Sequence, residues 1–194
     1  MMTQLEQYIN LNFTVTGEEV SKIASLFQPD TLRKGDFYIK NGEACDKLSF
    51  VQSGFLRLYA TSGDKDITQW IFSKGYFIGD MPSLTFNVPS RWNIQALTDI
   101  ELFTIQKSDY NKIVDTVPRW LEIEKHFLIR CFSIMEDRIF AHLSMSAEER
   151  YAFFYKHNKE LFNEVPLQYI ASLLGMTSET FSRVRKRLHA IASD

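Results

Sequence analysis

Six polar and charged side chains near the end of the sequence recur at the positions that a helix would leave exposed. They are Ser178, Glu179, Ser182, Arg183, Arg185 and Lys186. Side chains of these types bind nucleic acids: arginine hydrogen-bonds guanine, a carboxylate accepts from the cytosine amino group, and hydroxyls and lysine contact the phosphate backbone. This segment is therefore a candidate surface for reading double-stranded DNA.

The stretch from Leu167 to Leu188 has the spacing of two short helices that cross at a tight turn. Apolar residues recur with a period near 3.6 in each half, and Gly175 lies between the halves, where a helix end favours left-handed backbone. Ala171 provides the small side chain at which the second helix packs closely against the first. Thr177 or Ser178 can cap the second helix, because a hydroxyl accepts from an unpaired backbone N–H. We expect a helix-turn-helix; the alternative is a helical hairpin with a solvated basic face.

Charge is distributed unevenly along the chain. Residues 165–194 contain four Lys/Arg and two Asp/Glu, whereas the remaining residues contain 18 basic and 22 acidic side chains. A basic helix on an otherwise acidic chain favours a localised contact with a polyanion over unspecific attraction.

A long amphipathic segment precedes this motif. Pro118 suits the first turn of a helix, and the helical period then continues to about Leu143. Apolar residues recur every seven positions on two adjacent stripes, so the apolar surface is wider than one packing neighbour requires. We expect a second copy of this helix as the partner in a parallel homodimer; the alternative is a helix buried between two domains. The expected interface residues are Trp120, Phe127, Leu128, Ile134 and Met135.

From Thr31 to about Ile105 the hydrophobic period changes to two, as in β-strands. This region contains six of the eight glycines, which divide it into short runs. Roughly eight short strands are expected, at the spacing typical of a jelly roll or β-sandwich. Shorter helices are expected before this region, at residues 16–27 with a capping-box pattern at the start, and after it, at residues 108–117 and 148–162.

The composition argues against several classes of protein. No stretch approaches ~20 consecutive apolar residues, and the N-terminal sequence lacks a signal-peptide pattern, so we expect a cytoplasmic protein without a membrane partner. Cys45 and Cys131 lie far apart, which favours two free thiols over a disulfide framework or a metal site. Residues 31–105 contain no histidine, so a metal-dependent enzyme of the cupin type is not expected. We predict that the protein is not an enzyme.

The order of these elements resembles the Crp/Fnr family of bacterial transcription regulators over nearly the whole chain. Two segments carry the resemblance: GMTSETFSRVRKRL looks like the recognition helix, and GYFIGDMPSLTFNVPSRWNIQALTDIELFTI looks like the cassette that holds a cyclic-nucleotide phosphate. The resemblance implies an α+β fold with an N-terminal jelly-roll β-domain of the cyclic-nucleotide-binding type, a long central dimerisation helix and a small helix-turn-helix domain. The corresponding ranges are 1–117, 118–145 and 146–194. The resemblance also places base-contacting positions at Ser178, Glu179 and Arg183.

The cassette departs from the pattern of the family members that bind cyclic AMP. The resemblance aligns the Gly-Glu pair of the cassette with Gly79 and Asp80, and its phosphate-binding arginine with Ser90. Asp80 is one methylene shorter than glutamate, Ser90 has no charge, and Arg91 is displaced by one position, which on a strand turns it to the other face. In a loop, Arg91 can still turn inward. We therefore expect the domain to sense a small effector other than cyclic AMP, or none.

The sequence thus predicts a homodimeric DNA-binding regulator whose operator is an inverted repeat. RNA polymerase is a further candidate partner of such a regulator. The alternative is a cyclic-nucleotide-type ligand-binding module that acts through a protein partner, with its last helices as the interaction surface.

Overall fold

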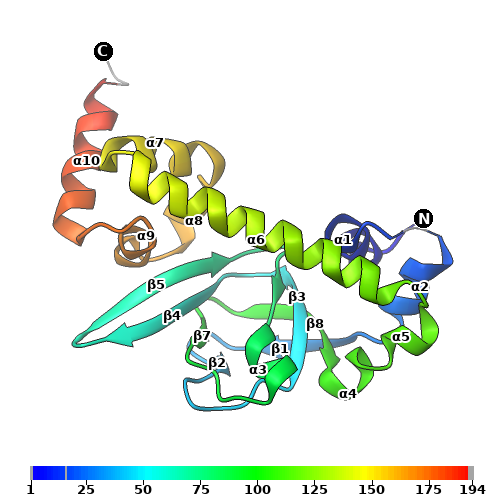
Figure 1. Cartoon of the computed structure of the whole chain (residues 1–194). Coiled ribbons are helices and arrows are strands. Elements are labelled where there is room, and N and C mark those ends of the chain that lie inside the picture. The colour runs from blue at the N-terminus through cyan, green and yellow to red at the C-terminus, as the bar shows by residue number, and fades with distance from the viewer. Residues whose placement is uncertain (1, 16, 192–194) are drawn as a thin grey trace.

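Two four-stranded antiparallel sheets face each other in the computed structural model, which describes residues 2–15 and 17–191 (Figure 1). One sheet has the order β1-β8-β3-β6 and the other β2-β7-β4-β5. The strands are β1 (Gln28–Leu32), β2 (Phe37–Ile39), β3 (Lys47–Ser53), β4 (Leu56–Ser62), β5 (Lys65–Phe72), β6 (Phe77–Ile78), β7 (Asn93–Ala96) and β8 (Ile100–Gln106). The predicted jelly-roll β-domain is confirmed.

Strand β3 shows why the sequence of this domain consists of short, strongly apolar runs. Alternate side chains of a strand point to opposite faces. Phe50 packs on Phe13 of the first helix, with ring centres 6.1 Å apart, whereas Ser49 hydrogen-bonds Tyr38 of the opposite sheet, Oγ to Oη 3.0 Å. Both faces of β3 are therefore buried, one under helices and one between the sheets.

The chain crosses from one sheet to the other at Gly54, between β3 and β4. Gly54 has φ +90°, and a Cβ at this position would lie 2.4 Å from the carbonyl oxygen of Asp99. Only glycine fits both the backbone conformation and the close approach.

The predicted helices are present at about the expected positions, but their first and last residues differ from those predicted. They are α1 (Gln4–Phe13), α2 (Glu18–Ala24), α3 (Met81–Phe86), α4 (Lys107–Tyr110), α5 (Ile113–Thr116), α6 (Trp120–Ser144), α7 (Ala147–His157), α8 (Leu161–Glu164), α9 (Leu167–Leu173) and α10 (Ser178–Ile191). The helix expected at residues 108–117 is two short helices, and the helix expected at 148–162 ends at Asn158, whose amide donates to the carbonyl of Phe154. An asparagine side chain that bonds the backbone competes with the helix. Pro118 lies outside α6, two residues before it, rather than in its first turn.

Helix α1 was not predicted, although the sequence carries its signals. Thr3 and Glu6 form a complete capping box, and Leu5, Tyr8 and Ile9 are buried at helical spacing. Thr16, where the capping pattern of the next helix was expected, lies outside the described residues, and α2 begins after Gly17 without a side-chain cap.

The residues that the structure describes form two hydrophobic cores. The first joins the sheets to α1, α2 and the first half of α6, whereas the second joins α7 to α10 to the outer face of the β2-β7-β4-β5 sheet through Ile71 and Leu97. In Figure 1, α6 runs over the sheets from the N-terminal helices to the C-terminal helices. Among the described residues, no helix combines the length and apolar character needed to cross a membrane.

Candidate functional site

Helices α9 and α10 are joined by the tight turn that the spacing predicted. Gly175 has φ +68°, and the turn is closed by a hydrogen bond from the Met176 N–H to the Ala171 carbonyl, N to O 2.9 Å. Thr177 caps α10, since its Oγ1 accepts from the Thr180 N–H at 3.1 Å. Two helices joined by a tight turn, with the second capped at its start, form the arrangement expected of a helix-turn-helix.

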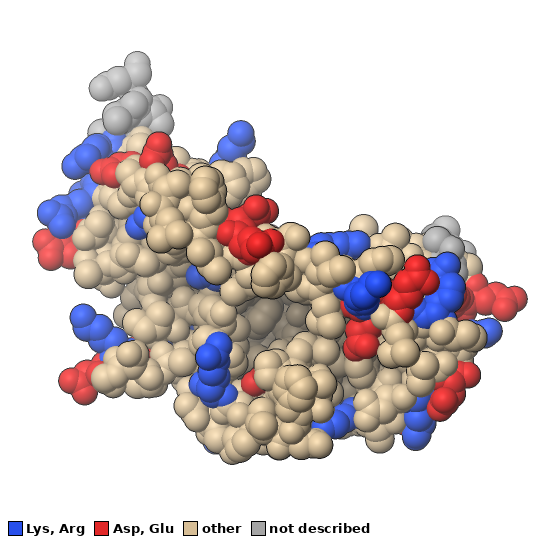
Figure 2. Space-filling view, viewed as in Figure 1, with Lys and Arg blue, Asp and Glu red and all other residues tan. Residues whose placement is uncertain are grey.

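Helix α10 separates a buried apolar face from an exposed polar face. Phe181 and Val184 are buried in the second core. All six candidate DNA-contacting residues are exposed: Ser178, Glu179, Ser182, Arg183, Arg185 and Lys186. Figure 2 shows basic side chains gathered at the end of the molecule where α10 lies. Arg187, which was not a candidate, is tied to α7 by an ion pair with Glu148, Nη1 to Oε1 2.8 Å.

Arg185 lies at the edge of this polar face. Burial raises the pKa of the Tyr151 hydroxyl on α7, and the positive charge of Arg185 opposes that rise. Glu179, Ser182, Arg183 and Lys186 form the centre of the exposed face, because their spacing of three and four residues places them on one side of the helix.

The structure separates the two apolar stripes of α6. Trp120 is 3% exposed and Phe127 7% exposed, and both rings pack on Phe13, with centres 5.0 and 4.8 Å from it. The prediction that Trp120 and Phe127 face a second copy is wrong, because the chain's own core buries them. Ile134 continues the same stripe beyond this core and is exposed.

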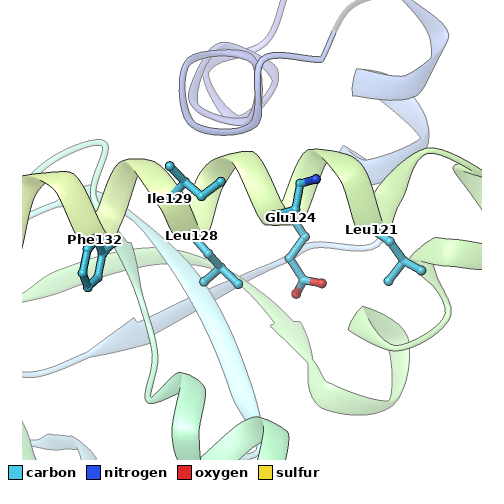
Figure 3. Close-up of a pocket in the computed structure, with 6 residues that line it drawn as sticks. Leu121, Glu124, Leu128, Ile129 and Phe132 are labelled. Carbon is cyan, nitrogen blue, oxygen red and sulfur yellow. The ribbon is translucent and has the colours of Figure 1, made fainter.

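The second stripe is largely exposed, with Met135 half-buried. We call the apolar stripe the set Leu121, Leu128, Phe132, Met135 and Ile139, which recur at the alternating intervals of a coiled-coil seam. Leu128 is 41% and Phe132 64% exposed. Figure 3 shows Leu121, Leu128 and Phe132 pointing to the same side of α6, where with Glu124 and Lys125 they line an open groove. Of the expected interface residues, Leu128 and Met135 lie on this stripe.

Glu124 is held in place at the edge of the groove. Tyr110 of α4 donates its hydroxyl hydrogen to the Glu124 carboxylate. Burial and this carboxylate together raise the pKa of the Tyr110 hydroxyl, which therefore stays protonated and remains a donor. The bond ties the start of α6 to the β-domain.

In the cassette, Gly79 and Asp80 are engaged in packing and capping. A Cβ at Gly79 would lie 2.2 Å from Cδ2 of Leu48, so any side chain at this position would require the buried Leu48 of β3 to shift. The Asp80 carboxylate is buried and caps α3, accepting from the Ser83 N–H at 3.3 Å. Ser83 Oγ in turn accepts from the Cys45 N–H at 2.8 Å. Asp80 therefore places its own negative charge at the N-terminal end of α3.

Ser90 and Arg91 lie in different environments. Ser90 is buried, and its Oγ accepts from the Trp92 N–H at 3.1 Å, while its backbone bonds Gly42 and Glu43 at 2.7 and 2.8 Å. Arg91 is exposed, with its guanidinium carbon 4.6 Å from the centre of the Trp92 ring. The structure thus brings Gly79 and Asp80 together with Cys45 and Ser83, and it leaves Arg91 on the surface.

A chain of hydroxyl groups inside the β-domain was not predicted from the sequence. Ser49 Oγ lies 3.0 Å from Tyr38 Oη and 2.7 Å from Thr104 Oγ1, and Thr104 donates to Asp30 at 3.3 Å. Burial raises the pKa of Tyr38 well above its usual value, so its hydroxyl stays neutral. The signal was a polar residue within each of two apolar runs, at Ser49 and Thr104, which pair directly across β3 and β8.

Comparison with known proteins identifies the β-domain. Residues 29–117 match the family model of the cyclic nucleotide-binding domain. Over 101 residues the chain is 26% identical to a cAMP-dependent protein kinase regulatory subunit of Debaryomyces hansenii. The matched segment is 52% of this chain and 22% of that protein. The chain therefore spans about a fifth of the length of that relative.

Solved structures extend the likeness to most of the chain. The Thermus thermophilus catabolite activator protein is 25% identical with a TM-score of 0.56, over 92% of this chain and 84% of that chain. FixK2 from Bradyrhizobium japonicum is 18% identical with a TM-score of 0.69, over 86% of each chain. The predicted α+β architecture of a Crp/Fnr regulator is confirmed, while the exact domain boundaries at 117/118 and 145/146 stay a prediction.

The separation of the two stripes on α6 predicts different effects for neighbouring substitutions. We expect Leu128→Glu to dissociate a dimer while each subunit stays folded, because a carboxylate on the apolar stripe would be buried without a partner. Phe127→Glu should instead unfold the β-domain, since Phe127 packs on Phe13 and Phe77. Sedimentation and circular dichroism distinguish the two. A wild-type monomer at micromolar concentration, or a Leu128→Glu dimer, would contradict the assignment of the stripe.

The cassette geometry predicts that cyclic AMP does not stabilise the protein. Ser90 offers no cation to pair with a phosphate, and the Asp80 carboxylate is already engaged in capping α3. A ligand at about 100 times its Kd adds about 2.7 kcal/mol to the free energy of unfolding, so binding would be plain in a thermal melt. We expect an unchanged melting temperature in millimolar cyclic AMP. A rise of several degrees that Arg91→Ala abolishes would show that Arg91 turns inward to hold the phosphate.

Proposed function

We propose that this chain, which carries a cyclic nucleotide-binding domain at residues 29–117 within the fold of Crp/Fnr regulators, is a homodimeric DNA-binding transcription regulator. The observation that carries the proposal is the exposed face of α10, which bears Ser182, Arg183 and Lys186. A capped helix held by a tight turn and bearing these groups can enter the major groove with its side chains directed at base edges.

The apolar stripe of α6 supports the dimeric part of the proposal. Several large apolar side chains are exposed at coiled-coil spacing along a helix of 25 residues. Pairing the stripe with a second copy buries both seams at once and relates the two α10 helices by a twofold axis. A twofold protein reads an inverted repeat, with half-sites about 34 Å apart, or one helical turn.

The β-domain is proposed to respond to a small molecule other than cyclic AMP, or to act as a scaffold without one. In the cassette, Asp80 caps α3 and the Ser90 hydroxyl accepts from a backbone N–H, so both groups are already partnered. A phosphate would have to displace these bonds without an arginine at Ser90 to offset the loss.

One observation favours the second candidate, a ligand-binding module that acts on a protein partner. The D. hansenii relative is named as a regulatory subunit of a protein kinase, and its similarity covers about half of this chain. The fold that extends through α10 favours DNA over this alternative, because the solved structure of the catabolite activator protein aligns with 92% of the chain.

Two substitutions on α10 should have different effects on DNA binding. Arg183→Ala should cost ~1 to 3 kcal/mol on the best site and relax selectivity at one base pair, because a bidentate contact to guanine is lost. Lys186→Ala should weaken all sequences about equally and flatten the salt dependence, as expected for a phosphate contact.

Selection of binding sites from random DNA, followed by titrations of both variants at several salt concentrations, measures these effects. Lys159 is an exposed lysine outside α9 and α10, so Lys159→Ala is the matched control. It should change neither the sequence selectivity nor the salt dependence of DNA binding. No enrichment of any sequence by the wild-type protein would refute the DNA-binding function and leave the protein-partner alternative.

A further inference from the structure

Strand β5 has an irregularity where the C-terminal helices meet the β-domain. The strand lies at the edge of its sheet, and its pairing with β4 shifts from Leu58 opposite Trp70 to Tyr59 opposite Thr68. Gln69 is therefore an extra residue, a β-bulge. A bulge interrupts the ladder and leaves backbone groups available to other partners.

The C-terminal half of the chain bonds to the backbone at this bulge. Ser172 of α9 accepts from the Thr68 N–H, N to Oγ 2.9 Å. Arg138 of α6 donates both to the carbonyl of Gln69 and to the carbonyl of Leu173, the last residue of α9. One guanidinium thus holds the strand and the helix at a fixed distance from each other.

A buried arginine reinforces the same contact from β4. Arg57 is 4% exposed, and its guanidinium carbon lies 4.1 Å from the ring centre of Tyr59 and 4.0 Å from that of Tyr169 on α9. Its Nε donates to Thr68 Oγ1 at 2.9 Å, and its Nη1 pairs with Asp66 at 3.4 Å. A buried guanidinium needs several partners in defined directions, so the arrangement tolerates little sliding of α9 along the sheet.

Apolar packing joins the same elements. Ile71 of β5 and Leu97 after β7 belong to the core that contains Ile170 and Leu173 of α9 and Phe181 of α10. In Figure 1, α9 lies over β5, while α10 stands beyond it. The sheet therefore fixes the orientation of α9. Because the tight turn at Gly175 joins α9 to α10, the orientation of α10 depends on that of α9.

We propose that the bulge contact, formed by Arg57, Thr68, Gln69, Arg138, Tyr169 and Ser172, fixes the direction of the recognition helix, and that Arg57 and Ser172 are positioning residues for DNA binding. This inference rests on the proposed function. In a dimer the contact sets the relative orientation of the two α10 helices, and hence the separation of half-sites that the dimer binds best. Neither residue touches the DNA; both act through α9.

Ser172→Ala tests the contact itself. The Thr68 amide should exchange slowly with solvent in the wild-type protein and faster in the variant, whereas amides in the centre of β3 should be unaffected. Equal exchange of Thr68 in the two proteins would overturn the proposal, because it would show that Ser172 does not hold the strand.

Operators with altered spacing test the consequence. Inverted repeats with the half-sites one or two base pairs closer or farther apart are compared with the selected site and with an isolated half-site. The wild-type dimer should prefer its own spacing by roughly tenfold or more, since both half-sites must be engaged together. Arg57→Met and Ser172→Ala should reduce this preference to within about threefold and leave half-site affinity unchanged.

The control is Lys65→Met, on the exposed tip of the same hairpin, which should keep the wild-type spacing preference. Arg57→Lys keeps the charge without the planar fork and should resemble Arg57→Met.

Retention of the wild-type spacing preference by folded Arg57→Met or Ser172→Ala would overturn the proposal. Tighter binding of all operators by these variants would also overturn it, because it would mean that the contact opposes DNA binding. If Arg57→Met does not fold, Ser172→Ala decides. Failure of the wild-type protein to bind any inverted repeat would refute the proposed function instead.

Discussion

Helix α6 has to bury apolar side chains on two sides, and one chain supplies a partner for only one of them. The side that carries Trp120, Ile123 and Phe127 is covered by α1 and the β-domain. The apolar stripe from Leu121 to Ile139 lies on another side and remains in contact with water. Exposed apolar side chains along this length of a regular helix indicate an interaction surface. The proposed dimer, its twofold symmetry and the spacing of its DNA half-sites all depend on this constraint.

The second constraint is the junction between the β-domain and the C-terminal helices. Because Ile71 and Leu97 are part of the same core as Phe181, movement of the helix-turn-helix would expose apolar surface as well as break the bonds at the Gln69 bulge. The protomer is expected to behave as one body that carries α10 in a defined direction. An effector bound in the β-domain can change that direction only to the extent that it favours a different β5–α9 contact.

The sequence predicted helices and turns well where the residue types and the hydrophobic periodicity indicate the same element. The turn at Gly175, the cap at Thr177 and the length of α6 follow from residue types at fixed spacing. The division of the α6 stripes did not follow, because periodicity shows which residues are apolar and does not show which partner covers them. The Gln69 bulge was not predicted either, since it depends on a strand register and on Ser172, which is 104 residues away from Thr68 in the sequence. In the cassette, the resemblance singled out Asp80 and Ser90 as departures, which stays a prediction, and their roles in capping and backbone bonding required the structure.

Hydroxyl-radical footprinting of the protein on its selected DNA site is the most direct test of a twofold dimer on DNA, because it records where two copies of α10 meet one duplex. We expect two equal protected patches on one face of the DNA, related by a twofold axis and centred about 34 Å apart, with protection of both patches lost together in Leu128→Glu. A single protected patch, or two patches that persist when the protein is monomeric, would contradict the twofold dimer.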